Sequence, residues 1–471
     1  MERASSSTKS GKGKRPHVIV VPYPAQGHIN PMLQFSKRLI SRGVKATLAT
    51  TVFVAKSMHL NQTSSTISVE SFSDGFDQGG FGQAASDEDY VATFRAVGSR
   101  TLTHLIQRLN TSNDNDSDHD HNDRDPVTAV IYDGFMPWAL DVAKDLGLVG
   151  AVFFTQSCAV NSVYFHVQRG LLPLPLTEST VLLPGLPLLR ASETPSYVSD
   201  YGSYPAIYQM VVDQFTNVDQ ADYVLFDCFY EMEKQVVDWM AQRWRVGTIG
   251  PTLPSKYLDG RLEDDTDYVI NLFEPSSDEC MSWLGTKPEG SVVYASFGSM
   301  VKVSQEQMEE VAWGLEKTNF YFLWVVRADE EVKLPANFNR AGGKGLVVNW
   351  APQLEVLAHP ATGCFLTHCG LNSVVEAMCL GVPMVAVPQW TDQITNAKYV
   401  EDVWRVGVRA AVDGKTAARR ETVEMCIREV MEVRRDELKV NAESWKGLAR
   451  QALDEGGSSD LCINDFVAAL L

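Results

Sequence analysis

The chain alternates short apolar runs with longer segments of helical period, and this alternation constrains its fold more than any other feature. Near the start, HVIVVPYP is followed by INPMLQFSKRLISRG, and later VTAVIYD is followed by MPWALDVAKDLG. Strands that alternate with helices at this spacing form parallel sheets covered by helices on both faces. The sequence therefore predicts an α/β protein with doubly wound parallel sheets.

A second alternating series follows a stretch rich in Pro, Gly and acidic residues. Its predicted strands lie in SVVYASFG, FYFLWVV, GLVVNW, GCFLTH and PMVAVPQ. At 471 residues and 45% hydrophobic, the chain is too long for one core and apolar enough to fill two. The predicted organisation is a disordered tail over 1–16, an N-terminal domain over 17–248, a linker over 249–267, a C-terminal domain over 268–450, and a C-terminal helix over 451–471 that packs back on the N-terminal domain.

The charge and cysteine content exclude several classes of protein. A formal net charge of -18 opposes binding to nucleic acids and anionic membranes. Eight cysteines without a C-x-x-C pair are typical of reduced thiols in a cytosol. There is no apolar leader and no run of about 18 apolar residues. We expect a cytoplasmic monomer with no membrane span, no nucleic-acid partner and no metal, and we interpret the acidic stretch over 110–125, which has two histidines, as a solvated loop rather than a metal tract.

The sequence FLTHCGLNS, residues 365–373, joins a predicted strand over 363–367 to a helix that we expect to open at Asn372 or Ser373 and to end at Gly381. Unpaired N–H groups at a helix start bind phosphate, and His368 and Ser373 can add donors. A second interpretation stays open, because Ser373 and Glu376 also have the spacing of a capping box that touches no ligand.

Other strand ends carry groups that complement an anion site. The segment SFGS over 296–299 allows close approach by a phosphate oxygen. Trp350 offers a flat indole for stacking on a base, although a core position is the commoner fate of Trp. Asp392 and Gln393 can hold vicinal hydroxyls. Because ligands lie at the carboxyl ends of parallel strands, these groups predict one site for a sugar nucleotide.

Two residues of the N-terminal half are candidates for acid–base chemistry. His28 follows the first strand, with Asn30 and Pro31 predicted as the cap and first residue of a helix, and a helix start favours the neutral imidazole that accepts a proton. Asp133 ends the strand VTAVIYD, so the two side chains can meet at one sheet edge. A second interpretation stays open for both residues: His28 as a polar loop residue and Asp133 as a turn or cap residue.

The segment WAPQLEVLAHPATGCFLTHCGLNSVVEAMCLGVPMVAVPQWTDQ, residues 350–393, closely resembles the signature box of plant family 1 UDP-dependent glycosyltransferases. The likeness extends over nearly the whole chain, including PYPAQGHINPMLQFSKRL and SVVYASFGS. The resemblance implies a GT-B fold, in which two Rossmann-like domains face a central cleft. It also implies inverting, metal-independent transfer of glucose from UDP-glucose, a co-substrate rather than a cofactor, to a hydroxyl or carboxyl of a small lipophilic acceptor such as a flavonoid, steroid or triterpenoid.

The same resemblance implies a role for each matching residue. His28 is expected to act as the base and Asp133 to orient it. Trp350, Ala351, Gln353 and Glu376 are expected to hold the nucleoside. The diphosphate ligands are expected to be Ser299, His368, Asn372 and Ser373, and the sugar ligands Thr155, Asp392 and Gln393, with Gly27, Gly370 and Leu371 completing the substrate-binding set. Leu371 departs from the family, which has Trp there, so donor affinity and the choice of sugar are the properties that this change affects.

The sequence lacks the motifs of two rival functions. A serine hydrolase would need G-x-S-x-G and a dinucleotide oxidoreductase G-x-G-x-x-G, and neither occurs where it is needed. A non-catalytic sugar-nucleotide-binding protein remains the alternative. We expect the acceptor pocket to be formed by the N-terminal loops 72–95 and 190–215. The aromatic residues predicted to line it are Phe72, Phe76, Phe81, Tyr90, Tyr197, Tyr201, Tyr204 and Tyr208.

Overall fold

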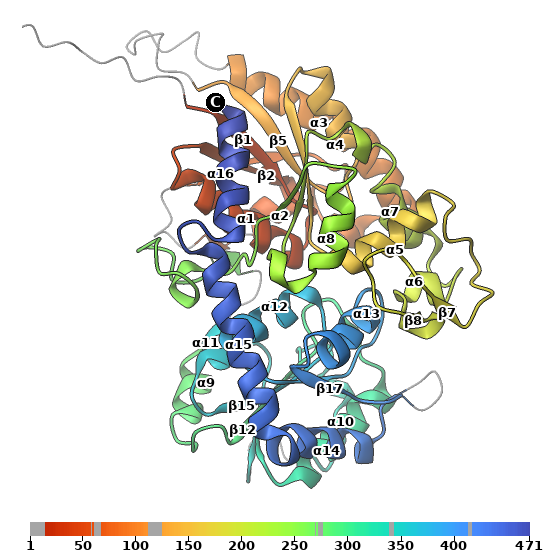
Figure 1. The fold of residues 1–471 in the computed structure, drawn as a ribbon, viewed down its shortest axis with the longest axis vertical. Helices are drawn as coiled ribbons and strands as arrows, with labels where there is room; N and C mark the ends of the chain where they lie inside the picture. Colours follow the sequence, from red (N-terminus) through yellow and green to blue (C-terminus); the bar gives the residue numbers. More distant parts are fainter. Residues whose placement is uncertain are drawn as a thin grey trace, which may run out of the picture.

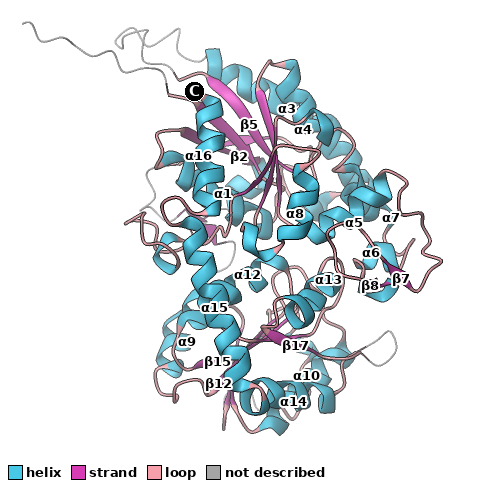
Figure 2. Cartoon of the chain, in the orientation of Figure 1, coloured by secondary structure: helices cyan, strands magenta, loops and turns pink. Residues whose placement is uncertain are grey.

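The computed structural model of the protein describes residues 15–57, 59–60, 67–111, 125–268, 270–271, 277–338, 343–412 and 417–471. The predicted tail over 1–16 and the acidic stretch over 110–125 lie almost wholly outside these residues. The chain forms two helix-covered parallel sheets, one in each half of the molecule in Figure 1, and Figure 2 shows the strands at the centre of each half. The predicted α/β class with two parallel sheets is confirmed.

Within the described residues, the N-terminal sheet has seven parallel strands in the order β10-β9-β6-β5-β1-β2-β4. All five residues of the interior strand β1 are buried, as expected of a strand covered on both faces. The strands are β1 (His17–Val21), β2 (Lys45–Thr51), β4 (Ser68–Phe72), β5 (Val127–Asp133), β6 (Val149–Phe154), β9 (Tyr223–Phe226) and β10 (Val246–Thr248). Two short antiparallel pairs join β3 (His59–Leu60) to β11 (Ile270–Asn271) and β7 (Thr180–Val181) to β8 (Leu189–Arg190).

The helices of this half pack on the sheet or close over its carboxyl edge. They are α1 (Gln26–Ile40), α2 (Val52–Ser57), α3 (Asp87–Thr111), α4 (Trp138–Asp145), α5 (Cys158–Gln168), α6 (Ser196–Ser199), α7 (Pro205–Asp213) and α8 (Lys234–Ala241). In the part of the chain that the structure describes, no helix has both the length and the apolar character that crossing a bilayer requires.

The C-terminal sheet has the order β14-β13-β12-β15-β16-β17, again with parallel pairing throughout. Neighbouring residues of β12 point to opposite faces: Tyr294 stacks on Phe365 with ring centroids 5.0 Å apart, whereas Val293 joins the separate core on the far face. The strands are β12 (Val292–Ser296), β13 (Tyr321–Val325), β14 (Gly345–Val348), β15 (Thr362–Thr367), β16 (Met384–Ala386) and β17 (Gly407–Arg409). The helices are α9 (Ser277–Leu284), α10 (Gln305–Thr318), α11 (Gln353–Ala358), α12 (Leu371–Leu380), α13 (Gln393–Lys398), α14 (Arg420–Arg428), α15 (Arg435–Leu453) and α16 (Ser458–Leu470).

Two segments connect the halves. The residues predicted as a linker, 249–267, pack against α1, where Arg38 forms a bidentate ion pair with Asp259. The chain returns from the C-terminal half through α15, and the last helix, α16, lies against the N-terminal half, as Figure 1 shows in blue. Its Phe466 contacts Phe35 of α1 and Tyr223 of β9, with ring centroids 6.1 and 5.0 Å away.

Candidate active site

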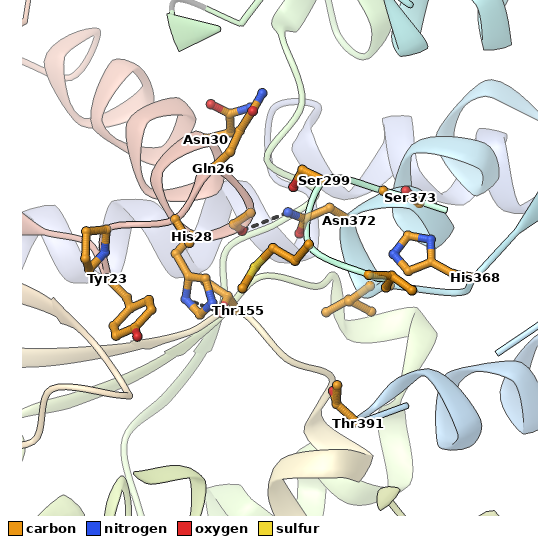
Figure 3. A pocket seen from close by; sticks show the side chains of 18 of the residues that line it. Tyr23, Gln26, His28, Asn30, Thr155, Ser299, His368, Asn372, Ser373 and Thr391 are labelled. Carbon is orange, nitrogen blue, oxygen red and sulfur yellow. Dashed lines mark hydrogen bonds between the residues drawn. The ribbon is translucent and has the colours of Figure 1, made fainter. Parts of the chain in front are cut away.

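A cavity of about 1040 Å³ lies between the two halves, at the carboxyl ends of both sheets. Residues from both halves line it, and Figure 3 shows His28 and Thr155 on one side and Ser299, His368 and Ser373 on the other. This is where parallel sheets place their ligands. Of the sixteen residues predicted for the site, fifteen line this cavity, and Asp133 is the exception.

The predicted acid–base pair is formed by α1 and β5. Nδ1 of His28 lies 2.6 Å from Oδ2 of Asp133, whose side chain is 1% exposed and does not itself reach the cavity. Oδ1 of Asp133 accepts the N–H of Phe135 at 3.0 Å, and the hydroxyl of Thr155 lies 3.1 Å from the same Nδ1. The rings of Tyr23 and Phe135 pack against the imidazole. Nε2 is thus the ring nitrogen left for a substrate.

The start of α1 differs from the prediction. The helix begins at Gln26 with Ala25 as its N-cap, so His28 lies in the first turn and Asn30 is not a cap. Pro31 therefore lies inside the helix, where it has no N–H to donate to the carbonyl of Gly27. The side-chain amide of Asn372 in the other half donates to that carbonyl instead, at 2.8 Å. Pro31 thus leaves a backbone carbonyl beside His28 without a donor from the helix, and Asn372 of the opposite domain donates to it.

The helix start opposite His28 also differs from the prediction. α12 begins at Leu371, one residue before the expected start, with Gly370 as its N-cap and Gly381 in the left-handed conformation at its end. No side chain caps this helix, so the alternative of a capping box is wrong. Ser373 instead accepts a hydrogen bond from Gln353 at 3.0 Å. The first N–H groups of α12 are therefore left for a ligand.

His368 lies at this helix start and is held neutral by its surroundings. Burial lowers its pKa to about 4, and its Nδ1 has no hydrogen-bond partner among the described residues. Two glycines pack on the ring: a Cβ on Gly298 would lie 2.8 Å from it and one on Gly370 would lie 2.6 Å from Nε2. A neutral imidazole carries one N–H group, which can donate a hydrogen bond to a phosphate oxygen. Ser299 lines the same side of the cavity.

The predicted nucleoside residues surround a buried carboxylate. Glu376 accepts hydrogen bonds from the amide of Gln353 at 2.6 Å and from the hydroxyl of Tyr268 at 2.9 Å. Burial raises the pKa of Glu376 to about 7, and these two bonds only partly offset that effect. Trp350 and Ala351 line the cavity beside this group. No sequence pattern marks Tyr268, because an isolated Tyr after a linker belongs to no motif.

The predicted sugar residues lie at the start of α13. Oδ2 of Asp392 accepts from the amide of Asn396 at 2.7 Å, and the Thr391 hydroxyl bonds Oδ1. The Gln393 side-chain oxygen accepts the N–H groups of Gln389 and Trp390 at 3.0 and 3.2 Å. Burial raises the pKa of Asp392. The two side chains are thus held rigidly at the cavity wall, and the amide nitrogen of Gln393 remains for a ligand.

Thr391 adds a contact between the halves that sequence reasoning missed. Its N–H donates to the hydroxyl of Ser196 at 2.7 Å, and its carbonyl accepts the N–H of Ser196 at 2.9 Å. Its φ of 55° is unusual for a β-branched residue and is a local sign of a constrained position. Leu371, the departure from the family pattern, is 4% exposed and still lines the cavity.

The acceptor-side prediction is half wrong. Phe81, Tyr90, Tyr197 and Tyr204 line the cavity, but the other four predicted aromatic residues do not. Phe72 and Phe76 face the core, where they stack on Phe94 and Tyr90, and Tyr201 and Tyr208 pack on each other 5.2 Å apart. The cavity uses other apolar side chains that were not predicted. They include Tyr23, Phe53, Phe135, Ile207, Met210, Val211 and Trp390.

One cluster in the described residues has the atoms for a metal ion, and it lies outside the cavity lining. Cys158, Cys228 and Glu233 are buried together behind the site. Both oxygens of Glu233 already accept N–H groups at the start of α5, from Cys158 and Ala159 at 2.8 Å each. Burial raises the pKa of the Cys158 thiol. At Cys228 the hydrogen bond with Cys158 lowers the pKa, but burial together with nearby carboxylates raises it by more, so both thiols disfavour the thiolate form that a metal binds. The cluster is therefore explained as a helix cap.

Comparisons with known proteins agree with this geometry. Residues 236–441 match the family model described as UDP-glucoronosyl and UDP-glucosyl transferase, and residues 16–73 match a glycosyltransferase N-terminal domain. The chain is 47% identical to the flavonol 7-O-beta-glucosyltransferase UGT74F1 of Arabidopsis thaliana, over 97% of this chain and 98% of that protein. It is 46% identical to a mogroside I-E synthase of Siraitia grosvenorii, over 96% and 98%. The crystal structure of Os79 from O. sativa in complex with UDP superposes with a TM-score of 0.89 at 38% identity, covering 96% of this chain and all of that one.

Proposed function

The chain belongs to the UDP-glucoronosyl and UDP-glucosyl transferase family, and on that premise we propose that it transfers glucose from UDP-glucose to a hydroxyl of a small lipophilic acceptor, with inversion at the anomeric carbon. The fold is the GT-B fold of its structural relatives. The relatives named for a flavonol and for a mogroside favour a polycyclic acceptor.

The observation that carries this proposal is the meeting of two groups from opposite domains. The amide of Asn372, in the first turn of α12, is bonded to the carbonyl of Gly27, the residue next to His28. The imidazole and the anion-binding helix start therefore face one cavity. A donor held by its diphosphate at α12 presents its sugar towards Nε2 of His28.

Each step follows from these positions. Nε2 of His28 takes the proton of the acceptor hydroxyl while the oxygen forms a bond to the anomeric carbon. The bond from that carbon to the β-phosphate oxygen breaks, and its electron pair leaves with UDP. Asp133 stabilises the imidazolium through Nδ1, as the carboxylate does in hydrolytic triads. The N–H groups of α12 and the neutral His368 stabilise the charge on the leaving diphosphate.

The donor roles follow the same geometry. Trp350 and Ala351 hold the uracil, and Glu376 with Gln353 holds the ribose. Ser299, Asn372 and Ser373 line the diphosphate position, while Thr155, Asp392 and Gln393 face the sugar. Leu371 offers the backbone N–H that a Trp would offer, so phosphate binding persists with less side-chain bulk beside the sugar.

The test is an acceptor panel incubated with UDP-glucose, with UDP release measured and the products analysed by mass and by proton NMR. We expect acceptor-dependent UDP release and a β-glucoside. His28→Ala should lose about 10²- to 10⁴-fold in turnover and still bind UDP, whereas the exposed control His104→Ala should match the parent protein.

Two results would contradict the proposal. Unimpaired turnover by His28→Ala would show that His28 is not the base. An α-glucoside would show that the anomeric carbon is not inverted. UDP binding without turnover on any acceptor would support the alternative, a non-catalytic sugar-nucleotide-binding protein.

A further inference from the structure

A short helix of the N-terminal half is bonded to the loop that carries the predicted sugar residues. Ser196 opens α6, and its hydroxyl accepts the N–H of Thr391 at 2.7 Å. The N–H of Ser196 donates in return to the carbonyl of Thr391 at 2.9 Å. Thr391 directly precedes Asp392 and Gln393, and Figure 3 shows it on the loop that leads into α13. The following inference rests on the proposed function and concerns how its sugar site is held.

Thr391 has a backbone conformation that its side chain disfavours. Its φ is 55°, in the left-handed region, which is rare for a β-branched residue. Such a conformation persists only where the surrounding structure holds it. Both the N–H and the carbonyl of Thr391 are bonded to Ser196. The opposite half of the molecule therefore holds Thr391 in this conformation.

The conformation of Thr391 sets the direction of the side chains that follow it. The Thr391 hydroxyl bonds Oδ1 of Asp392, while Oδ2 accepts from the amide of Asn396 at 2.7 Å. Asp392 and Gln393 both line the cavity. A change of φ at Thr391 would turn the chain just before these two residues. It would therefore move them relative to α12, where the proposed diphosphate site lies.

Other contacts dock the same two segments, so the Ser196 hydroxyl is not needed to keep them together. The Thr395 hydroxyl of α13 donates to the carbonyl of Glu193 at 2.8 Å, and Arg409 forms an ion pair with the Glu193 carboxylate at 3.0 Å. The ring of Tyr197 packs edge-on against Trp390, with centroids 6.0 Å apart. Loss of the Ser196 hydroxyl should therefore change the loop locally and leave the segments docked.

We propose that Ser196 is a positioning residue for the donor sugar. From the N-terminal half it holds Thr391 in the conformation that points Asp392 and Gln393 at the sugar, so the sugar site is complete only when the two halves are docked. Ser196 does not itself line the cavity and acts through Thr391. The residues proposed to hold the nucleoside and the diphosphate lie on other elements, so the binding of UDP does not depend on Ser196.

Calorimetry with UDP and with UDP-glucose, in the absence of acceptor, tests the inference on the full-length protein. Ser196→Ala removes the hydroxyl and leaves the N–H of Thr391 without its partner. We expect the Kd of UDP-glucose to rise by about five- to tenfold, while the Kd of UDP stays unchanged and shows that the variant is folded. Ser196→Thr keeps a hydroxyl and should restore the affinity. Ser203→Ala, an exposed change in the loop after α6, should match the parent protein.

Transfer should slow as well, because a misplaced sugar no longer meets the acceptor in the reacting geometry. At saturating donor and acceptor, we expect kcat of Ser196→Ala to fall by about tenfold or more. The inference is overturned if Ser196→Ala binds UDP-glucose as tightly as the parent protein does. It is equally overturned if the variant weakens UDP and UDP-glucose alike, which is the result of a purely structural role.

The proposed function fails separately, if no acceptor releases UDP from the parent protein. The two binding constants need no acceptor, so they still decide the role of Ser196 in that case.

Discussion

Asp133→Asn isolates the electrostatic part of the proposed mechanism. Asn has nearly the size of Asp, and its oxygen can still accept the N–H of Phe135, which lies 3.0 Å from Oδ1. What the variant loses is the negative charge 2.6 Å from Nδ1 of His28. The geometry of the cavity should therefore survive while the imidazolium loses its partner.

The structure bounds the size of the effect. A charge-assisted hydrogen bond contributes about 2 kcal/mol net, which sets the lower bound. Two unit charges separated by the observed 2.6 Å attract by about 6 kcal/mol at an effective dielectric constant of about 20, which sets the upper bound. Since each 1.4 kcal/mol is roughly tenfold in rate, we expect kcat to fall by between about 30-fold and about 10⁴-fold.

The assay is steady-state kinetics with UDP-glucose and a series of acceptors whose hydroxyls differ in acidity. The loss should be largest for an aliphatic alcohol and shrink for an acidic phenol, which needs less help from a base. The KM for UDP-glucose should stay within about threefold, because Asp133 does not line the cavity. Asp145→Asn, an exposed change at the end of α4, is the control. An aliphatic acceptor turned over at the parent rate by Asp133→Asn would refute the reasoning.

Three further predictions concern the donor side. Gly370→Ala should weaken UDP binding by about tenfold or more, by calorimetry, because the new Cβ would lie 2.6 Å from Nε2 of His368; Gly447→Ala, where nothing lies within 4 Å, should bind normally. Because the pKa of His368 is lowered to about 4 in the folded protein, the unfolded chain binds more protons than the folded protein below the ordinary His pKa of about 6.5, and up to about 3 kcal/mol of stability is lost as pH falls from about 6.5 towards 4. Thermal melting of His368→Asn should therefore show a smaller loss of stability over that pH range than the exposed variant His104→Gln. Equal slopes for the two variants would contradict the assignment. Uridine binding should weaken as pH falls through about 7, where Glu376 takes up a proton. Tyr268→Phe should move the midpoint of this pH dependence upward, because it removes a hydrogen-bond donor to the ionised carboxylate. An unmoved midpoint would mean that Tyr268 does not set the charge of Glu376.

Local patterns in the sequence predicted the parallel sheets, and the residues named at strand ends line one cavity with the exception of Asp133, because each strand-to-helix corner depends on nearby residues. The run FLTH followed by Gly is one example, and its helix begins within one residue of the expected start. The start of α1 was misjudged because Asn30-Pro31 has the form of a helix start, while the real start at Gln26 has no side-chain cap to mark it.

Contacts between the halves could not be predicted, because they join residues hundreds of positions apart. The bond from Asn372 to Gly27 and the one from Thr391 to Ser196 depend on how two sheets face each other. The prediction of the aromatic residues that line the cavity was half wrong for a related reason. Phe76 and Tyr201 lie in the same loops as Tyr90 and Tyr204, and only the packed fold decides which side chains turn inward.

The central claim is that one cavity brings a diphosphate site of the C-terminal half to the imidazole of the N-terminal half. A crystal structure with a non-transferable UDP-glucose analogue and a bound acceptor tests it most directly. We predict the diphosphate at the start of α12 and Nε2 of His28 about 3 Å from the acceptor hydroxyl, with that oxygen about 3 to 3.5 Å from the anomeric carbon. An acceptor oxygen out of hydrogen-bond reach of His28 in the occupied, closed cavity would contradict the account.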